Sequence, residues 1–350
     1  MTAGQTSLKA MLGTELPLIQ APMAGIQGSA MVVAVCNAGG LGSLPCAMLS
    51  LQALQGELDT ISKQTSKPYN VNFFCHEPPV VSTEREAAWR QALAPYYAEL
   101  GLDVATVPPG AGRSPFSHEA ADVLEAFRPA VVSFHFGLPS PDLLARVRAW
   151  GAVVLASATT VAEARWLEAH GADAIIAQGL EAGGHRGMFL TDEVSTQLGS
   201  FALLPQVVNA VGVPVIAAGG IADARGVAAA MAMGASAVQV GTAYMLCPEA
   251  TTSAVHRAAF KSGAASHTAL TNLFTGRPAR GIMNRVMREL GPLSAAPPAF
   301  PLATAAIAPL RACAESLGLG DFSPLWSGQN NSTCREIPAA QLTRELIAGL

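Results

Sequence analysis

Short apolar runs recur along the chain, separated by stretches in which apolar residues have helical spacing. The runs lie at 17–24, 40–45, 69–74, 130–137, 153–158, 174–179, 214–220 and 237–242. Apolar runs without polar alternation are typical of strands buried on both faces, as in a parallel sheet. The intervening pattern predicts helices, among others at 29–39, 141–150, 160–171, 201–211 and 223–234.

The order of these elements predicts the fold class. Eight strand–helix units in succession favour an α/β fold of the (β/α)8 TIM-barrel type. Glycine follows several predicted helices, as expected for left-handed helix ends, at Gly39, Gly151, Gly171, Gly212 and Gly234. A doubly wound open sheet is the alternative. It accounts less well for eight strands and for the absence of a G-x-G-x-x-G run after an early strand.

Two long segments interrupt the regular alternation. Residues 75–130 form an extended connection between the third and fourth strands, with a helix expected at 83–100. Residues 261–324 are too long for a barrel loop, and they contain a β-like run at 267–274 and a helical stretch at 282–290. We therefore expect a barrel over 1–260, a small inserted cap domain over 261–324, and a C-terminal segment with a closing helix over 325–350.

Composition and charge limit the classes of molecule that this chain is expected to bind. The chain has 350 residues, 50% of them hydrophobic, and a formal net charge of −4 without basic clusters, which disfavours nucleic acid or acidic membranes as partners. No apolar stretch approaches the roughly 18–20 residues of a membrane helix, and the N-terminus lacks a signal-peptide pattern. Six scattered cysteines without zinc spacing indicate reduced thiols, so we expect a cytoplasmic protein without a bound metal.

Polar residues stand at the predicted carboxyl ends of strands, where barrels of this kind bind ligands. Asn72, His135 and Gln178 end the third, fourth and sixth strands. Polar side chains in a buried sheet are costly unless they have partners, so their concentration at one end predicts a site. Met23, after the first strand, is expected either to lie against a ligand or to pack in the core.

The last two predicted strands end in glycine-containing turns. Gly219 and Gly220 precede a helix that begins near Asp223, and Gly241 and Thr242 follow the eighth strand. Backbone amides at these positions favour a phosphate site, with ordinary tight turns as the alternative. Because no P-loop or dinucleotide fingerprint is present, a mononucleotide such as FMN is favoured over NAD or ATP. The amides of Asn72 and Gln178 suit the polar edge of a flavin.

The stretch QGLEAGGHRG (178–187) places a histidine among glycines at the mouth of the predicted barrel. Gly183 and Gly184 would let the backbone approach the flavin, which leaves His185 facing a substrate. A histidine can hold or move a proton near neutral pH, so His185 is the candidate catalytic residue. A solvent-facing loop histidine is the alternative. Arg186 is interpreted either as a group that attracts an anionic substrate or as a solvated charge.

These stretches resemble the successive motifs of the nitronate monooxygenases, formerly called 2-nitropropane dioxygenases. The motifs are IQAPMAG, YNVNFF, QGLEAGGHRG, VIAAGGIADARG and AVQVGTAYM, and NVNFFCHEPP and LWSGQ resemble the bacterial class I branch in particular. The resemblance covers nearly the whole chain in the same order. It implies an FMN-containing barrel that uses O2 to oxidise alkyl nitronates, propionate 3-nitronate among them, to a carbonyl compound and nitrite.

The resemblance also implies roles for individual residues. Matched by position, the flavin contacts are Asn72, Gln178, Gly183, Gly220, Gln239, Val240, Gly241 and Thr242. His185 matches the active-site histidine, which would stabilise the nitronate or act as a base toward a neutral nitroalkane, and His135 matches a second histidine near the substrate. Members often place tyrosines in the wall of the pocket, where this chain is expected to use Phe300 and Trp326.

Two other functions stay open on the same barrel. The first is an FMN-dependent NAD(P)H:quinone reductase or enoyl reductase, for which the sequence offers no clear nicotinamide site. The second is a flavin carrier or sensor without turnover, for which His185 at the mouth would have no purpose. Small molecules are the expected partners in each case, and a homodimer is left open.

Overall fold

The computed structural model describes residues 7–104, 107 and 113–350, in which eight parallel strands form a nearly closed barrel. In chain order these are β1 (Leu18–Gln20), β2 (Ser43–Pro45), β3 (Asn70–Phe74), β4 (Val131–His135), β5 (Val153–Ala158), β6 (Ala174–Gln178), β8 (Val215–Ala218) and β9 (Ala237–Val240). Leu41 closes the ring beside β2, because its N–H donates to Leu18 O and its carbonyl accepts from Gln20 N, both at 2.9 Å. The predicted TIM barrel is confirmed and the open sheet is excluded. The expectation of no signal peptide falls partly on residues 1–6, which lie outside the described residues.

Helices surround this barrel, and their bounds follow local capping signals. They are α2 (Ser29–Asn37), α3 (Leu51–Gln64), α5 (His118–Phe127), α6 (Pro141–Ala149), α7 (Val161–Ala169), α8 (Ser200–Ala210), α9 (Ala224–Ala232) and α13 (Ala339–Ile347). The side chains of Ser50, Thr160 and Asp223 accept hydrogen bonds from first-turn amides of α3, α7 and α9. Of the glycines expected to end helices in the left-handed conformation, Gly212 is the exception, since α8 ends at Val211 in extended backbone.

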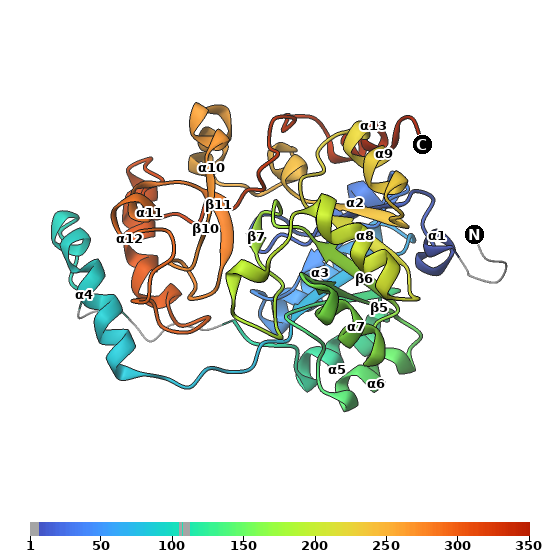
Figure 1. The fold of residues 1–350 in the computed structure, drawn as a ribbon, viewed down its shortest axis with the longest axis horizontal. Helices are drawn as coiled ribbons and strands as arrows, with labels where there is room; N and C mark the ends of the chain where they lie inside the picture. The colour runs from blue at the N-terminus through green and yellow to red at the C-terminus, as the bar shows by residue number, and fades with distance from the viewer. Residues whose placement is uncertain (1–6, 105–106, 108–112) are drawn as a thin grey trace.

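The barrel has separate cores inside and outside the ring of strands. Ile19, Leu155 and Ile216 belong to the inner cluster, while the outer faces of the strands pack against the helices. Helix α1 (Leu8–Leu12) inserts Leu8 and Leu12 into the inner cluster. Because α1 lies on the far side of the barrel from the second unit (Figure 1), these leucines fill that end of the interior.

A second, smaller unit lies beside the barrel (Figure 1). It contains α10 (Ala254–Lys261), β10 (Thr268–Thr271), β11 (Ala279–Ile282), α11 (Arg285–Glu289) and α12 (Thr304–Ser316), and a three-stranded sheet joins β10, β11 and the short β7 (Gly184–His185). Helix α4 (Thr83–Glu99), from the β3–β4 connection, shares the hydrophobic cluster of this unit. Trp89 and Tyr97 of α4 donate to the carbonyls of Ala303 and Ala306 at 3.0 and 2.6 Å. The second unit is thus built from three separated parts of the chain, 83–99, 184–185 and 254–316, and the expected domain boundaries at 260 and 324 stay a prediction.

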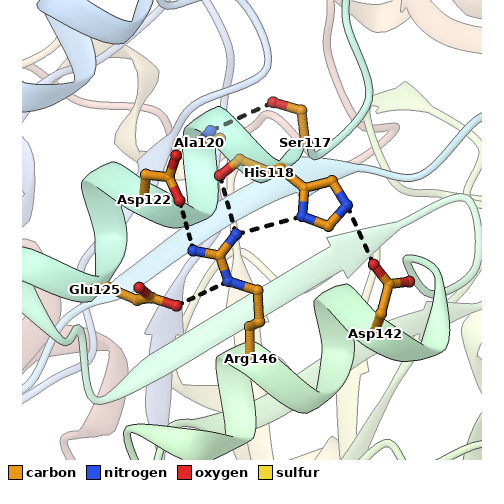
Figure 2. Close-up of polar contacts among 7 residues, drawn as sticks. All are labelled: Ser117, His118, Ala120, Asp122, Glu125, Asp142 and Arg146. Atoms are coloured by element: carbon orange, nitrogen blue, oxygen red, sulfur yellow. Dashed lines mark hydrogen bonds and ion pairs between the residues drawn. The ribbon is translucent and has the colours of Figure 1, made fainter.

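An ion-pair cluster joins α5 and α6 on the outside of the barrel (Figure 2). Arg146 of α6 contacts Asp122 and Glu125 of α5 at 2.6 and 2.8 Å, and His118 of α5 contacts Asp142 at 3.1 Å. All these groups are at least partly solvent-exposed, so salt screens their attraction. The cluster fixes the relative position of two neighbouring helices, and none of its members lines the cavity described below.

The described residues contain neither a membrane-spanning helix nor a cluster of metal ligands. No described helix is long and apolar enough to cross a bilayer. In the same part of the chain, no three His, Cys, Asp or Glu side chains stand close enough together to hold a metal ion. The six cysteines are unpaired, and half of them, Cys36, Cys46 and Cys247, are buried.

Candidate active site

A large cavity opens at the carboxyl ends of the barrel strands, facing the second unit. The space between its lining atoms is about 1300 Å³, including the part open to solvent. Small-molecule sites are usually concave clefts in which apolar side chains surround a few convergent polar groups, and this lining has that character, so the cavity is the candidate ligand site. Most of the residues singled out from the sequence line it, namely Met23, Asn72, His135, Gln178, Gly183, Gly184, His185, Gly219, Gly220, Gln239, Gly241, Thr242 and Trp326.

Two of the expected site residues do not line this cavity. Val240 is fully buried, and its side chain packs in the core between strands and helices. Phe300 lies behind the lining, in a small aromatic cluster with Phe74 and Phe136. Its ring centroid is 5.3 Å from that of His185, so Phe300 supports the histidine from the side.

His185 belongs to a strand and does not hang on a bare loop. In β7 it pairs with Ala279 of β11, which attaches it to the sheet of the second unit. Its Nε2 lies 2.9 Å from Thr275 Oγ1, and the Trp326 ring is centred 5.6 Å away. Within the described part of the chain no group hydrogen bonds to Nδ1, so that nitrogen is left for a ligand.

Two predicted site residues hold the backbone of His185 in place. Gln178 Nε2 donates to His185 O at 2.9 Å, and Gln178 Oε1 accepts from Gly187 N at 2.8 Å. His135 Nε2 lies 3.2 Å from the same carbonyl, and since a carbonyl only accepts, Nε2 carries the proton of a neutral His135 ring. Both ends of the Gln178 amide thus position the histidine, and the expected contact of Gln178 with a flavin stays a prediction.

The imidazoles at this site are neutral. Burial lowers the pKa of His185 well below its usual value, and the nearby positive charges of Arg113 and Arg277 act in the same direction. Burial likewise lowers the pKa of His135 to about 3. His185 therefore has an unprotonated nitrogen at neutral pH, which a proton acceptor requires.

A C-terminal segment, Ser327–Asn331, crosses the cavity and closes one side of it; we call it the strap. Gly328 N donates to Thr242 Oγ1, Gln329 N to Glu181 O, and Asn330 Nδ2 to Gly220 O, each at 2.9 Å. The sequence resemblance drew attention to LWSGQ, but local patterns gave no sign that it would meet residues about 85 to 150 positions earlier.

The strap explains the glycine at position 183. A Cβ there would stand 2.5 Å from Gly328 N and 2.6 Å from Ser327 C, closer than real Cβ atoms approach backbone. Gly184 differs, because its φ of 72° lies in the left-handed region and a Cβ would meet nothing within 4 Å. The strap thus requires glycine at position 183 and the backbone conformation favours it at 184, while the expectation that both admit a flavin stays a prediction.

One polar group in the cavity lacks a partner. Gln239 Oε1 is buried and has no hydrogen-bond donor among the described residues. An orphaned acceptor costs roughly 1–3 kcal/mol, which a ligand N–H would recover. The polar edge of a flavin ring carries such an N–H. The backbones of Gly219–Gly220 and Gly241–Thr242 line the same cavity and could accept a phosphate, so the residues present fit FMN.

Arg186 neither faces a substrate nor lies in solvent, the two interpretations that the sequence allowed. It is fully buried, and its guanidinium donates to Gly179 O and Gln178 O at 2.7 Å and to Gln197 Oε1 at 2.9 Å. Burial lowers its pKa to about 10, so it stays charged at neutral pH and braces the loop after β6. Sequence reasoning missed two residues that line the cavity, Arg113 and Ser157. Arg113 lies in the long connection after the third strand, where no strand end marked it, whereas Ser157 stands beside the end of the expected strand 153–158 and could have been found there.

Nearly the whole chain is similar to known proteins. Residues 5–349 match the family model described as nitronate monooxygenase. A Pseudomonas aeruginosa nitronate monooxygenase is 42% identical over 97% of each chain, and one from Paraburkholderia phytofirmans is 41% identical over 98% of this chain and 94% of its own. Among solved structures, a nitroalkane oxidase from Streptomyces ansochromogenes superposes with a TM-score of 0.90 at 38% identity, covering 98% and 97% of the two chains. FabK from Thermotoga maritima gives 0.69 at 26% identity, covering 98% and 95%.

Proposed function

The chain belongs to the nitronate monooxygenase family of oxidoreductases, and from this premise we propose that it binds FMN and uses O2 to oxidise alkyl nitronates to a carbonyl compound and nitrite. Propionate 3-nitronate is the substrate we expect it to favour. The observation that carries the proposal is a neutral, sterically fixed His185 in a cavity whose other polar groups suit a flavin and an anion.

The residues that would hold the cofactor come from several strand ends. Gln239 would accept from the ring and Asn72 would lie at its polar edge, while the backbone of 219–220 and 241–242 would contact the phosphate. The Met23 side chain, 3.5 Å from where a Cβ on Gly241 would stand, would pack against the ring. When bound, the flavin would supply the one-electron chemistry that links the nitronate to O2.

The protein itself would bind and orient the anion. The described lining contains no Asp or Glu, so a nitronate would meet no like charge from those side chains. His185 has Nε2 engaged with Thr275 and Nδ1 open, and its neutral ring can accept a hydrogen bond or a proton there. With a neutral nitroalkane, the same nitrogen would remove the α-proton before oxidation. Gln178 and His135 keep this nitrogen in position through the His185 carbonyl.

An anaerobic spectrum of the purified protein tests the proposal. We expect a yellow protein whose flavin absorbance bleaches when a nitronate is added and returns when oxygen is admitted, with nitrite released in stoichiometric relation to turnover. NADPH is added to a second sample. Rapid bleaching by NADPH but not by nitronate would contradict the proposal and favour a reductase on the same barrel. FMN bound without turnover of any nitronate, nitroalkane or quinone would indicate a flavin carrier.

A further inference from the structure

Arg113 is the one formally charged side chain among the described residues that line the cavity. It comes from the long β3–β4 connection, and its backbone carbonyl accepts from His76 Nε2 at 3.0 Å, which fixes the main chain at this point. The carbon of the guanidinium lies 5.8 Å from the centre of the Phe300 ring. Because Phe300 also neighbours His185, Arg113 and His185 flank the same aromatic ring.

Among the residues that the structure describes, the guanidinium of Arg113 has few hydrogen-bond partners for its five N–H groups. Its Nη1 donates to Thr304 Oγ1 at 3.3 Å, and Nη2 lies 4.0 Å from the sulfur of Met48. Within the described residues it makes no ion pair with a carboxylate, whereas Arg146, Arg285 and Arg311 each do. Withdrawing a cation from water without a counter-charge is unfavourable, so this arrangement favours an anionic ligand.

The geometry of a guanidinium selects the kind of anion. Its planar fork matches two carboxylate oxygens in parallel hydrogen bonds, which a point charge such as a lysine ammonium cannot reproduce. Thr304 Oγ1 stands beside it as a further polar group. A substrate that carries a nitronate at His185 and a carboxylate a few carbons away would satisfy both ends of this part of the cavity.

We propose that Arg113, with Thr304 beside it, forms an anion subsite that binds the carboxylate of carboxylated alkyl nitronates and so sets the specificity of the site. This inference rests on the proposed function and deepens it. Arg113 is a specificity-determining residue in this account, and the reacting carbon stays with His185.

Two nitronates of equal chain length test the subsite. Propionate 3-nitronate and propyl 1-nitronate differ in a carboxylate against a methyl group at the far end. We expect wild-type kcat/KM to be about 10- to 100-fold higher for the carboxylated compound, as one charge-assisted pair supplies. In Arg113→Met most of that preference disappears through a rise in KM, and the loss for propyl 1-nitronate is at least severalfold smaller. Arg113→Lys restores part of the preference.

Arg146→Met is the matched control. Arg146 lies on α6 on the outside of the barrel, pairs with Asp122 at 2.6 Å and does not line the cavity. Its loss changes net charge by the same amount, so we expect both substrates to respond alike. Flavin content and melting temperature are recorded for each variant. Succinate gives a readout without turnover, since it presents carboxylates and cannot be oxidised: it should compete in the wild type and much less in Arg113→Met.

The outcomes separate this inference from the proposed function. If the wild type oxidises neither nitronate, the proposed function fails. If it oxidises both with equal kcat/KM, or if Arg113→Met affects both equally, the function stands and the subsite is overturned. Should Arg113→Met fail to fold, the wild-type substrate ratio, succinate competition and Arg113→Lys decide the question, and the absence of both preference and competition would refute the subsite.

Discussion

Replacing Gly183 with alanine tests whether the strap or a ligand requires the glycine. The backbone at 183 is not left-handed, so alanine introduces no φ strain and the effect is steric. The new Cβ would meet Gly328 N at 2.5 Å and Ser327 C at 2.6 Å, both backbone atoms that cannot swing away as a flexible side chain would. The strap must therefore move.

The structure sets the size of the effect. A shift of the strap would lengthen or break the hydrogen bonds that Gly328, Gln329 and Asn330 donate. Each such bond contributes roughly 0.5–1.5 kcal/mol net, so losing all three would cost roughly 1.5–4.5 kcal/mol. Because the strap can shift without breaking every bond, we expect Gly183→Ala to lower the free energy of unfolding by about 1–3 kcal/mol, as overpacking generally does.

The assay compares urea unfolding of Gly183→Ala with that of the wild type, each with and without bound flavin. Gly263→Ala is the control, because that position has neither positive φ nor an atom within 4 Å of the added Cβ, and it should leave the midpoint nearly unchanged. A strap clash destabilises the flavin-free protein as well. If flavin-free Gly183→Ala is as stable as the wild type and only flavin retention falls, the strap argument is refuted.

Four further predictions follow from the same contacts. His185→Asn should retain flavin by its spectrum but lose about 10²–10⁴-fold in kcat, the contribution of a positioned acid–base group; wild-type turnover would contradict the assignment. The pKa of His135 is lowered to about 3, so the unfolded state binds more protons below pH 6.5, and stability falls between pH 6.5 and 3 by up to about 1.4 kcal/mol per pH unit. His135→Gln should flatten that slope in melts across pH. Arg186→Met leaves the buried carbonyls of Gly179 and Gln178 without this donor, and chemical denaturation should show a loss of about 1–3 kcal/mol for each acceptor left unsatisfied. Gly56→Ala, on the exposed face of α3, should instead gain about 0.5–1 kcal/mol in the same assay.

The barrel could be predicted from the sequence because its signals are local. Each parallel strand is buried on both faces and reads as an apolar run, as 174–179 does for β6. Strand ends of a barrel meet at one mouth, so Asn72, His135 and Gln178 could be assigned to one site without knowing any contact between them. The phosphate-binding role of the glycine turns and the flavin itself remain predictions.

The features that the sequence did not reveal depend on contacts between segments far apart in the chain, and no local pattern encodes such contacts. The partner of β7 is β11, almost a hundred residues later, so His185 was assigned to a loop. Helix α4 was expected, but its apolar residues do not reveal that they pack against α12. Arg186 looked solvated because arginine usually is, and its burial depends on the carbonyls of the loop that it braces.

The strap has a consequence for biosynthesis. Every barrel strand has been made once residue 240 leaves the ribosome, yet the cavity wall beside Gly183 and Gly220 comes from residues 327–331. Since domains fold as they are synthesised, the strands can pair while the mouth is still open on that side. A message truncated before codon 327 would thus yield a protein whose cavity stays open beside Gly183 and whose barrel also lacks α13, the helix that buries Leu342 and Leu346 against it.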